Sequence, residues 1–168
     1  MNSSVTTVGT DLTILLLLFG MSSLVIAIEP APILASEAVA LLTLEEAPGI
    51  FRQCSRKAPK VPKAALWIPS SAQIKELENG LPAFVAAATA RDSSAAPHAS
   101  GNYARQYVGY TLKRRRYIYG SFFPVDVLKE AGPPWKGAII ICDGGPAIWG
   151  VVYDLQRKAF MQLQINGS

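Results

Sequence analysis

The last third of the chain constrains the fold most, because short apolar runs alternate there with tight-turn sequences. Residues 136–142 contain a continuous apolar run, which is typical of a central strand. Residues 143–145 read Asp-Gly-Gly and favour a tight hairpin turn. Residues 147–153 predict a second strand, and residues 161–166 alternate apolar with amide side chains, as in a strand with one solvent-exposed face. The sequence thus predicts a three-stranded C-terminal meander.

The central part of the chain has the pattern of helices. Apolar side chains recur at helical spacing over residues 71–90. Ser70 and Gln73 form a capping-box pattern that marks a helix start. Gly80 suits the residue after a helix end, and Pro82 suits the first turn of a new helix. The sequence therefore predicts two short helices, over about 71–79 and 82–90, with a kink between them.

A second hairpin is predicted between the helices and the meander. Residues 103–112 alternate as a strand, and residues 116–123 form an aromatic-rich partner strand after a basic turn. Helices followed by a run of strands indicate an α+β fold. We expect two short N-terminal helices packed on an antiparallel sheet of about five strands.

The apolar segment at residues 12–28 suggests export. It carries no charge over 17 residues, which is long for a signal-peptide core and just short of a comfortable membrane span. Small residues around 35–40 suit a cleavage site, whereas residues 1–11 lack the bases that usually precede such a core. We expect residues 1–38 to be a signal peptide, with an uncleaved membrane anchor as the alternative.

The remaining chain divides into a linker and one domain. Residues 39–66 contain several prolines and a basic cluster without a sustained period, which is typical of an extended, disordered linker. Residues 67–168 are then a small α+β domain. The product is an exported protein, periplasmic or extracellular, and the alternative is an inner-membrane protein held by residues 12–28.

The two cysteines leave two alternatives open. In an oxidising compartment Cys54 and Cys142 can form a disulfide. Otherwise Cys142 is a small buried residue at the end of a core strand and Cys54 is free. Neither cysteine belongs to a CxxC motif, so the sequence contains no metal or redox signature.

The charge of the chain favours anionic partners. Sixteen basic residues exceed twelve acidic ones, and removal of residues 1–38 would delete three acids and no base. A basic exported domain attracts an anionic envelope component or an acidic protein face. Export makes nucleic acid a poor candidate.

No pattern in the chain predicts catalysis. The sequence has a single histidine, His98, and none of the common hydrolase or phosphate-loop motifs. We therefore expect no enzyme, no cofactor and no metal.

The strongest functional pattern is a basic run beside tyrosines. Arg114, Arg115 and Arg116 are followed by Tyr117 and Tyr119. Aromatic rings stack on a ligand while arginines hold carboxylate or phosphate in a two-point grip, so these five residues are candidate ligand-binding residues. The alternative is a solvated turn whose charge protects an edge strand from aggregation.

The C-terminal part, about residues 67–168, resembles a loose group of small exported uncharacterised proteobacterial proteins. The residues that carry the resemblance are Arg116–Gly120, Phe122, Phe123, Cys142–Gly145, Tyr153, Asp154, Phe160, Asn166 and Gly167. The resemblance implies export and a helix-plus-meander fold, and it transfers no activity.

These patterns together predict an exported small binding or inhibitor-like module without a catalytic motif. The alternative is a structural envelope protein anchored in the membrane by residues 12–28.

Overall fold

The computed structural model describes residues 38–91, 97, 102–131 and 137–167. The apolar segment 12–28, the cleavage region before Ala38, and His98 lie outside the described residues. Within the described ranges, none of the helices combines the length and the hydropathy that crossing a bilayer requires.

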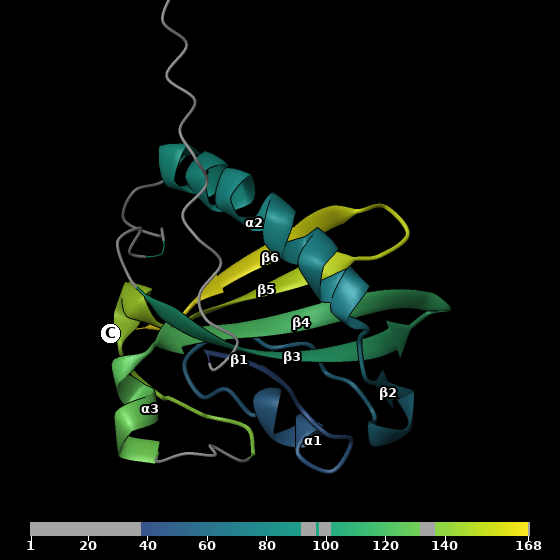
Figure 1. Cartoon of the computed structure of the whole chain (residues 1–168), viewed down its shortest axis with the longest axis horizontal. Helices are drawn as coiled ribbons and strands as arrows, with labels where there is room; N and C mark the ends of the chain where they lie inside the picture. The colour runs from purple at the N-terminus through teal and green to yellow at the C-terminus, as the bar shows by residue number, and fades with distance from the viewer. Residues whose placement is uncertain (1–37, 92–96, 98–101, 132–136, 168) are drawn as a thin grey trace, which may run out of the picture. The chain divides into compact units, whose positions relative to one another are not determined.

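The protein has an α+β fold built on one mixed sheet of six strands. The order is β1-β3-β4-β5-β6, and β2 pairs with β3 beside β1 (Figure 1). The pairing of β1 with β3 is parallel and all other pairings are antiparallel. The sheet is therefore mixed, whereas the sequence predicted a purely antiparallel one. The strands are β1 (Val39–Leu41), β2 (Leu66–Trp67), β3 (Tyr103–Leu112), β4 (Arg115–Pro124), β5 (Trp149–Asp154) and β6 (Ala159–Ile165).

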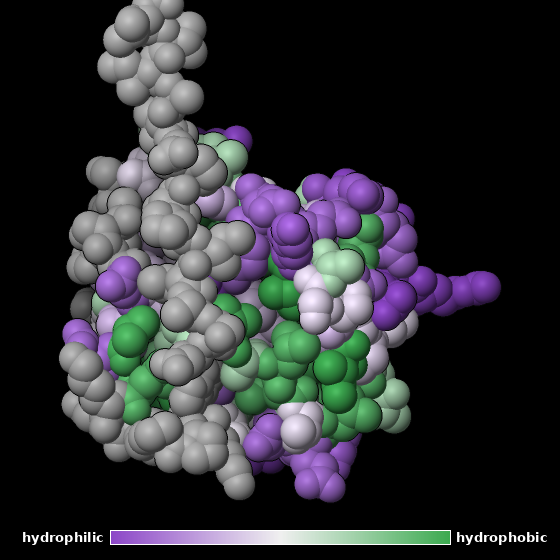
Figure 2. All heavy atoms as spheres, viewed as in Figure 1, coloured by the Kyte–Doolittle hydropathy of each residue, from purple (hydrophilic) through white to green (hydrophobic). Residues whose placement is uncertain are grey.

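The predicted hairpin is formed by β3 and β4, which pair over their whole length from Tyr103 opposite Pro124 to Leu112 opposite Arg115. Lys113 and Arg114 both adopt positive φ, 49° and 65°. Two left-handed residues give a two-residue turn the twist that matches the flanking strands. The end of this hairpin projects as a hydrophilic arm at the right of the view in Figure 2.

A single helix, α2 (Ser71–Arg91), replaces the two helices that the sequence predicted. Pro82 lies inside it and removes one backbone hydrogen bond, at a cost of about 3 kcal/mol. Packing on both sides of the proline offsets this cost, because Leu77 and Leu81 are buried on the sheet and Phe84 stacks on Phe160 at 4.5 Å between ring centroids. The break expected between residues 79 and 82 is therefore absent, because α2 continues through Gly80 and Pro82.

The start of α2 follows the predicted capping box. The backbone N–H of Gln73 donates to the Ser70 hydroxyl at 3.3 Å, and the Ser70 N–H donates to Gln73 Oε1 at 2.9 Å. Farther along the helix, Glu78 accepts a hydrogen bond from the Tyr107 hydroxyl and lies 3.4 Å from Arg105 Nε. These polar contacts hold α2 across the sheet.

The predicted meander is present in part. β5 and β6 pair as expected, but the strand beside β5 is β4, and residues 137–142 form no strand. Their backbone is bound by buried amide side chains: Gln106 donates to the Gly137 carbonyl at 2.7 Å and accepts from the Ile139 N–H at 2.8 Å. Because these amides satisfy the polar backbone, the apolar run needs no strand partner.

The predicted linker, residues 39–66, carries regular structure and packs on the sheet. It contains β1, β2, the short helix α1 (Ala47–Ile50) and the 3-10 turn η2 (Lys63–Ala65). Leu42, Ala47 and Ile50 are fully or almost fully buried. These few aliphatic anchors have no regular spacing, so the segment lacks the periodicity that would have distinguished it from a linker.

The sheet is covered on both faces. The helix face, which carries Ile118, Phe122 and Val151, packs against α2. The loop face, which carries Val108, Tyr119 and Val152, is covered by residues 42–61 and Ala138. A third cluster at the end of the sheet joins Phe123 and Ile148 to residues near helix α3 (Asp126–Ala131), and the turn η3 (Gly145–Ala147) precedes β5.

Candidate functional site

The predicted arginine and tyrosine residues are divided between the two faces of the sheet. Arg114 lies in the β3–β4 turn, and successive side chains of β4 alternate between faces. Arg116 is on the helix face, where its guanidinium carbon lies 3.9 Å from the Trp67 ring centroid. Tyr119 is completely buried on the loop face. Only exposed Arg115 and partly buried Tyr117 share an accessible side, so the five residues do not form one surface.

A groove on the loop face contains Tyr117 and has a volume of about 370 Å³. Its lining includes Tyr110, whose ring stacks on that of Tyr117 with centroids 5.2 Å apart. The eleven lining residues are Lys57, Ala58, Pro59, Lys60, Tyr110, Leu112, Tyr117, Val152, Met161, Gln162 and Gln164. The groove therefore joins part of the predicted site to residues 57–60, which the sequence placed in a linker.

The wall formed by residues 57–60 is held by two anchors immediately before it. A disulfide joins Cys54 to Cys142, with their Cα atoms 4.9 Å apart. Arg56 is only 6% exposed and points under the wall into the sheet. These anchors position Lys57 and Lys60 at the groove although both lysines are exposed.

Arg56 makes three buried hydrogen bonds. Its Nε donates to the Tyr119 hydroxyl at 3.2 Å, one terminal nitrogen donates to Asn166 Oδ1 at 2.7 Å, and the other donates to Ser121 Oγ at 2.7 Å. All three acceptors are neutral. Asn166 in turn donates to the carbonyls of Ile141 and Asp143 at 2.6 and 3.1 Å. Arg56 therefore links its own segment, the sheet and the chain near Cys142.

Three of the lining residues belong to β6, whose course is changed by a β-bulge. Val152 pairs with Gln162 while Tyr153 pairs with Phe160, so Met161 has no partner of its own. A bulge changes the direction of neighbouring side chains. Adjacent residues Met161 and Gln162 consequently both line the groove, together with Gln164.

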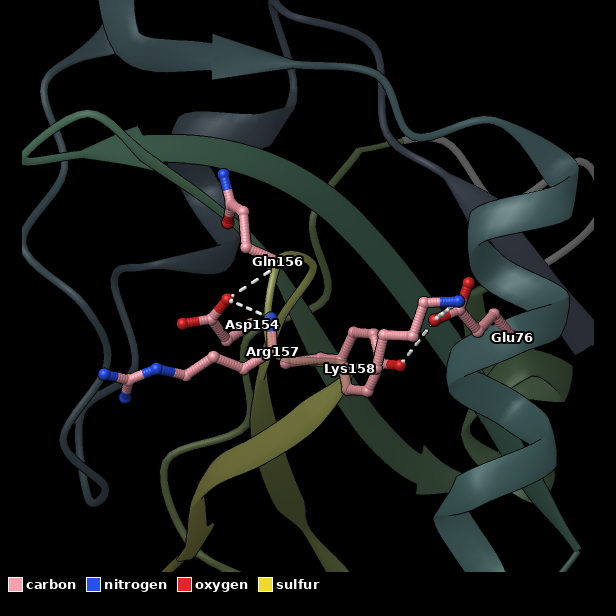
Figure 3. A network of polar contacts seen from close by, with 6 residues as sticks. Glu76, Asp154, Gln156, Arg157 and Lys158 are labelled. Carbon is pink, nitrogen blue, oxygen red and sulfur yellow. Dashed lines mark hydrogen bonds and ion pairs between the residues drawn. The ribbon is translucent and has the colours of Figure 1, made fainter.

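No acidic side chain lines the groove among the residues described. The nearest acid in register is Asp154, which pairs with Tyr117 across the sheet and is completely buried. Its Oδ1 accepts the backbone N–H groups of Gln156 and Arg157 at 3.0 and 3.1 Å (Figure 3), whereas its Oδ2 has no partner in the described chain. Asp154 therefore orders the β5–β6 turn.

Burial keeps several tyrosines protonated. It raises the pKa of Tyr110, and the neighbouring Tyr117, Tyr119 and Asp154 raise that pKa further. On the helix face, burial and a 3.0 Å hydrogen bond to Glu76 raise the pKa of Tyr153 to about 12. The same carboxylate also lies 3.3 Å from the Lys158 ammonium (Figure 3).

We expect the free energy of unfolding to fall steeply between pH 10 and pH 12. Burial raises the pKa of Tyr103, Tyr107, Tyr110, Tyr119 and Tyr153, so over this range the folded chain binds protons that the unfolded chain has released. Stability is then fully present below about pH 10 and decreases by up to about 1.4 kcal/mol per pH unit for each such tyrosine.

Urea unfolding at pH 9, 10, 11 and 12 measures this effect. Tyr153→Phe serves as the internal comparison, because it should lose less stability than the parent between pH 10 and pH 12, relative to its own value at pH 9. A parent protein equally stable at pH 9 and pH 11 would contradict the assignment.

Other site chemistry is limited within the described ranges. They contain no group of three or more His, Cys, Asp or Glu side chains that could hold a metal ion. The residues that the sequence analysis missed are Lys57, Lys60, Met161, Gln162 and Gln164. The basic cluster near Cys54 was a usable signal, but the groove also required the disulfide and the bulge.

Comparison of the chain with protein-family models, with curated proteins and with solved structures yielded no match.

Proposed function

We propose that this protein is an exported, non-catalytic binding module that takes an anionic ligand in the groove on the loop face. The observation that carries the proposal is the composition of the lining, which has two lysines and no acid among its described residues, beside a stacked tyrosine pair.

The lysines provide the attraction for an anion. Lys57 and Lys60 are exposed, and no carboxylate in the described part of the chain pairs with either. A concave surface of one sign of charge raises the local concentration of oppositely charged ligands. Arg115 lies on the same face, two residues from Tyr117, and adds to this field.

The remaining polar groups of the groove suit recognition of a ligand. The amides of Gln162 and Gln164 provide both hydrogen-bond donors and acceptors. Tyr117 is only partly buried, so part of its ring is available for stacking. A few polar groups in a mostly apolar lining are typical of small-molecule sites.

The disulfide supports export. Cys54 and Cys142 are joined over 88 residues of sequence, and structural disulfides persist in oxidising compartments such as the periplasm and the extracellular space. Together with the apolar segment at residues 12–28, this crosslink favours a protein that works outside the cytosol.

Replacing both groove lysines, as Lys57→Gln with Lys60→Gln, is expected to weaken binding of 2-naphthoate about tenfold, since each exposed charge contributes up to about 1 kcal/mol. The full chain is titrated with 2-naphthoate, and shifts of the Gln162 and Gln164 side-chain amides in ¹H–¹⁵N spectra measure binding at the groove. The affinity of the parent protein should also fall with added salt.

The matched control is Lys63→Gln with Lys75→Gln, which removes two exposed lysines outside the groove and should leave binding unchanged. Uncharged 2-naphthalenemethanol should bind more weakly than 2-naphthoate. Absence of shifts at both glutamines, or equal loss in the two lysine pairs, would contradict the proposal and favour a structural protein without a dedicated ligand.

A further inference from the structure

We propose that the natural ligand of the groove is a free fatty acid of medium length, whose carboxylate lies at Lys57 and Lys60 and whose alkyl chain lies along Leu112, Val152 and Met161. This inference rests on the anion-binding groove proposed above and adds the chemical class of its ligand.

Apolar side chains form a large part of the lining of the groove. Five of its eleven side chains are aliphatic or thioether groups: Ala58, Pro59, Leu112, Val152 and Met161. Leu112 and Met161 are 43% and 46% exposed. They come from different strands but line the same groove. Single exposed apolar residues are ordinary, but several around one concavity mark a surface that is covered by an apolar ligand.

The charged lining residues come from one segment only. Lys57 and Lys60 are three residues apart and enclose Ala58 and Pro59. The part of the lining that β6 provides contains no base, only Met161 and two glutamines. A polyanion would require bases spaced along the groove, and a sugar would require more hydrogen-bonding side chains. One anionic head with an apolar tail matches this asymmetry.

The size of the groove suits a tail of medium length. A methylene group has roughly the volume of a water molecule, about 30 Å³, so an open groove of about 370 Å³ has room for an alkyl chain of several carbons. Met161 has a flexible, polarizable side chain, which adapts to alkyl chains of different shape.

The groove is formed before the ligand arrives. The lysine wall follows directly after Cys54 and Arg56, which are held by the disulfide and by three buried hydrogen bonds. A wall fixed in this way need not be ordered by the ligand. Less of the favourable free energy of apolar contact is then lost to ordering the chain, and the affinity is higher.

The test is a chain-length series on the full chain. Hexanoate, octanoate and decanoate are titrated below their micelle concentrations, and only shifts of the Gln162 and Gln164 side-chain amides are counted, so that binding elsewhere on the chain is excluded. Each fully buried methylene lowers Kd up to about fourfold. Decanoate should therefore bind several-fold and up to about fifteenfold more tightly than octanoate, and uncharged decyl maltoside should bind weakly.

The variant Leu112→Gln with Met161→Gln should flatten the dependence of Kd on chain length. Leu44→Gln with Ile68→Gln is the matched control, because both residues are equally exposed hydrophobics outside the groove, and it should keep the dependence. Unshifted amides elsewhere in the sheet establish that each variant is folded.

Equal affinity for hexanoate and decanoate, or equal flattening in both variants, would overturn the fatty-acid assignment. If 2-naphthoate binding still depends on Lys57 and Lys60, the anion-binding groove survives that result. Tight binding to phosphatidylglycerol vesicles without any decanoate shift at the glutamines would also overturn it, in favour of a membrane surface.

Discussion

Replacing Cys54 and Cys142 with serine is expected to lower the free energy of unfolding by about 4 kcal/mol. The disulfide closes a loop of 88 residues, and a crosslink over such a distance restricts the unfolded chain by between about 3 and 5 kcal/mol in the chain-entropy model. Many small domains have a total stability of 5–15 kcal/mol, so the variant should lose a large fraction of its stability.

The same change should also weaken the groove. Lys57 follows Cys54 by three residues, and the wall has its other anchor at Arg56. Without the crosslink the wall must be ordered by the ligand, so the Kd for 2-naphthoate should rise. Urea unfolding and the amide titration measure the two effects separately.

The control for the serine variant is reduction of the parent protein. Dithiothreitol should lower the stability of the parent to that of the variant and should leave the variant unchanged. A double-serine variant within about 0.5 kcal/mol of the oxidised parent would contradict a stabilising role for the crosslink.

Arg56→Ala is expected to lower the free energy of unfolding by about 3 kcal/mol or more. The guanidinium donates to Tyr119, Ser121 and Asn166 at 2.7–3.2 Å in a site that is 6% exposed. Hydrogen bonds to a charged group are each worth about 1.5–3 kcal/mol, and the sum is reduced by the cost of burying the charge. Truncation leaves three buried polar groups without their donor.

Three further variants separate the effect of the charge from that of the hydrogen-bond geometry. Arg56→Lys keeps the charge but cannot reach three acceptors in different directions. It should therefore lose about half as much free energy of unfolding as Arg56→Ala. Arg52→Ala removes an exposed arginine of the same segment and should change stability by less than about 0.5 kcal/mol. Full stability in Arg56→Met would show that the buried guanidinium makes no net contribution.

The parts of the fold that could be predicted are those with local signals. The β3–β4 hairpin, β5 and β6 follow from period-two alternation and turn residues, and the start of α2 follows from its capping box. In each of them the decisive interactions join residues that are near in sequence or that repeat with a fixed period.

The candidate site could be predicted only in part. The basic run beside tyrosines lies at the end of the sheet where the groove is found, and one of its residues, Tyr117, lines the groove. Alternation along β4 then sends Arg116 to the opposite face and buries Tyr119. Neighbouring residues in a strand point to opposite faces of the sheet. A run of similar residues therefore predicts more site residues than one face can hold.

The sequence by itself determined the α+β class, the hairpin and the cysteine pair available for crosslinking, because local periodicity, turn chemistry and composition carry that information. The tertiary structure alone decided that α2 continues through Pro82, that residues 137–142 bind to the Gln106 and Asn166 amides instead of joining the sheet, and that residues 57–60 become a groove wall. These outcomes depend on apolar packing, on buried hydrogen bonds and on a disulfide, all of which join residues far apart in the chain. The energy of such contacts exists only once the two segments meet, and no local pattern records it.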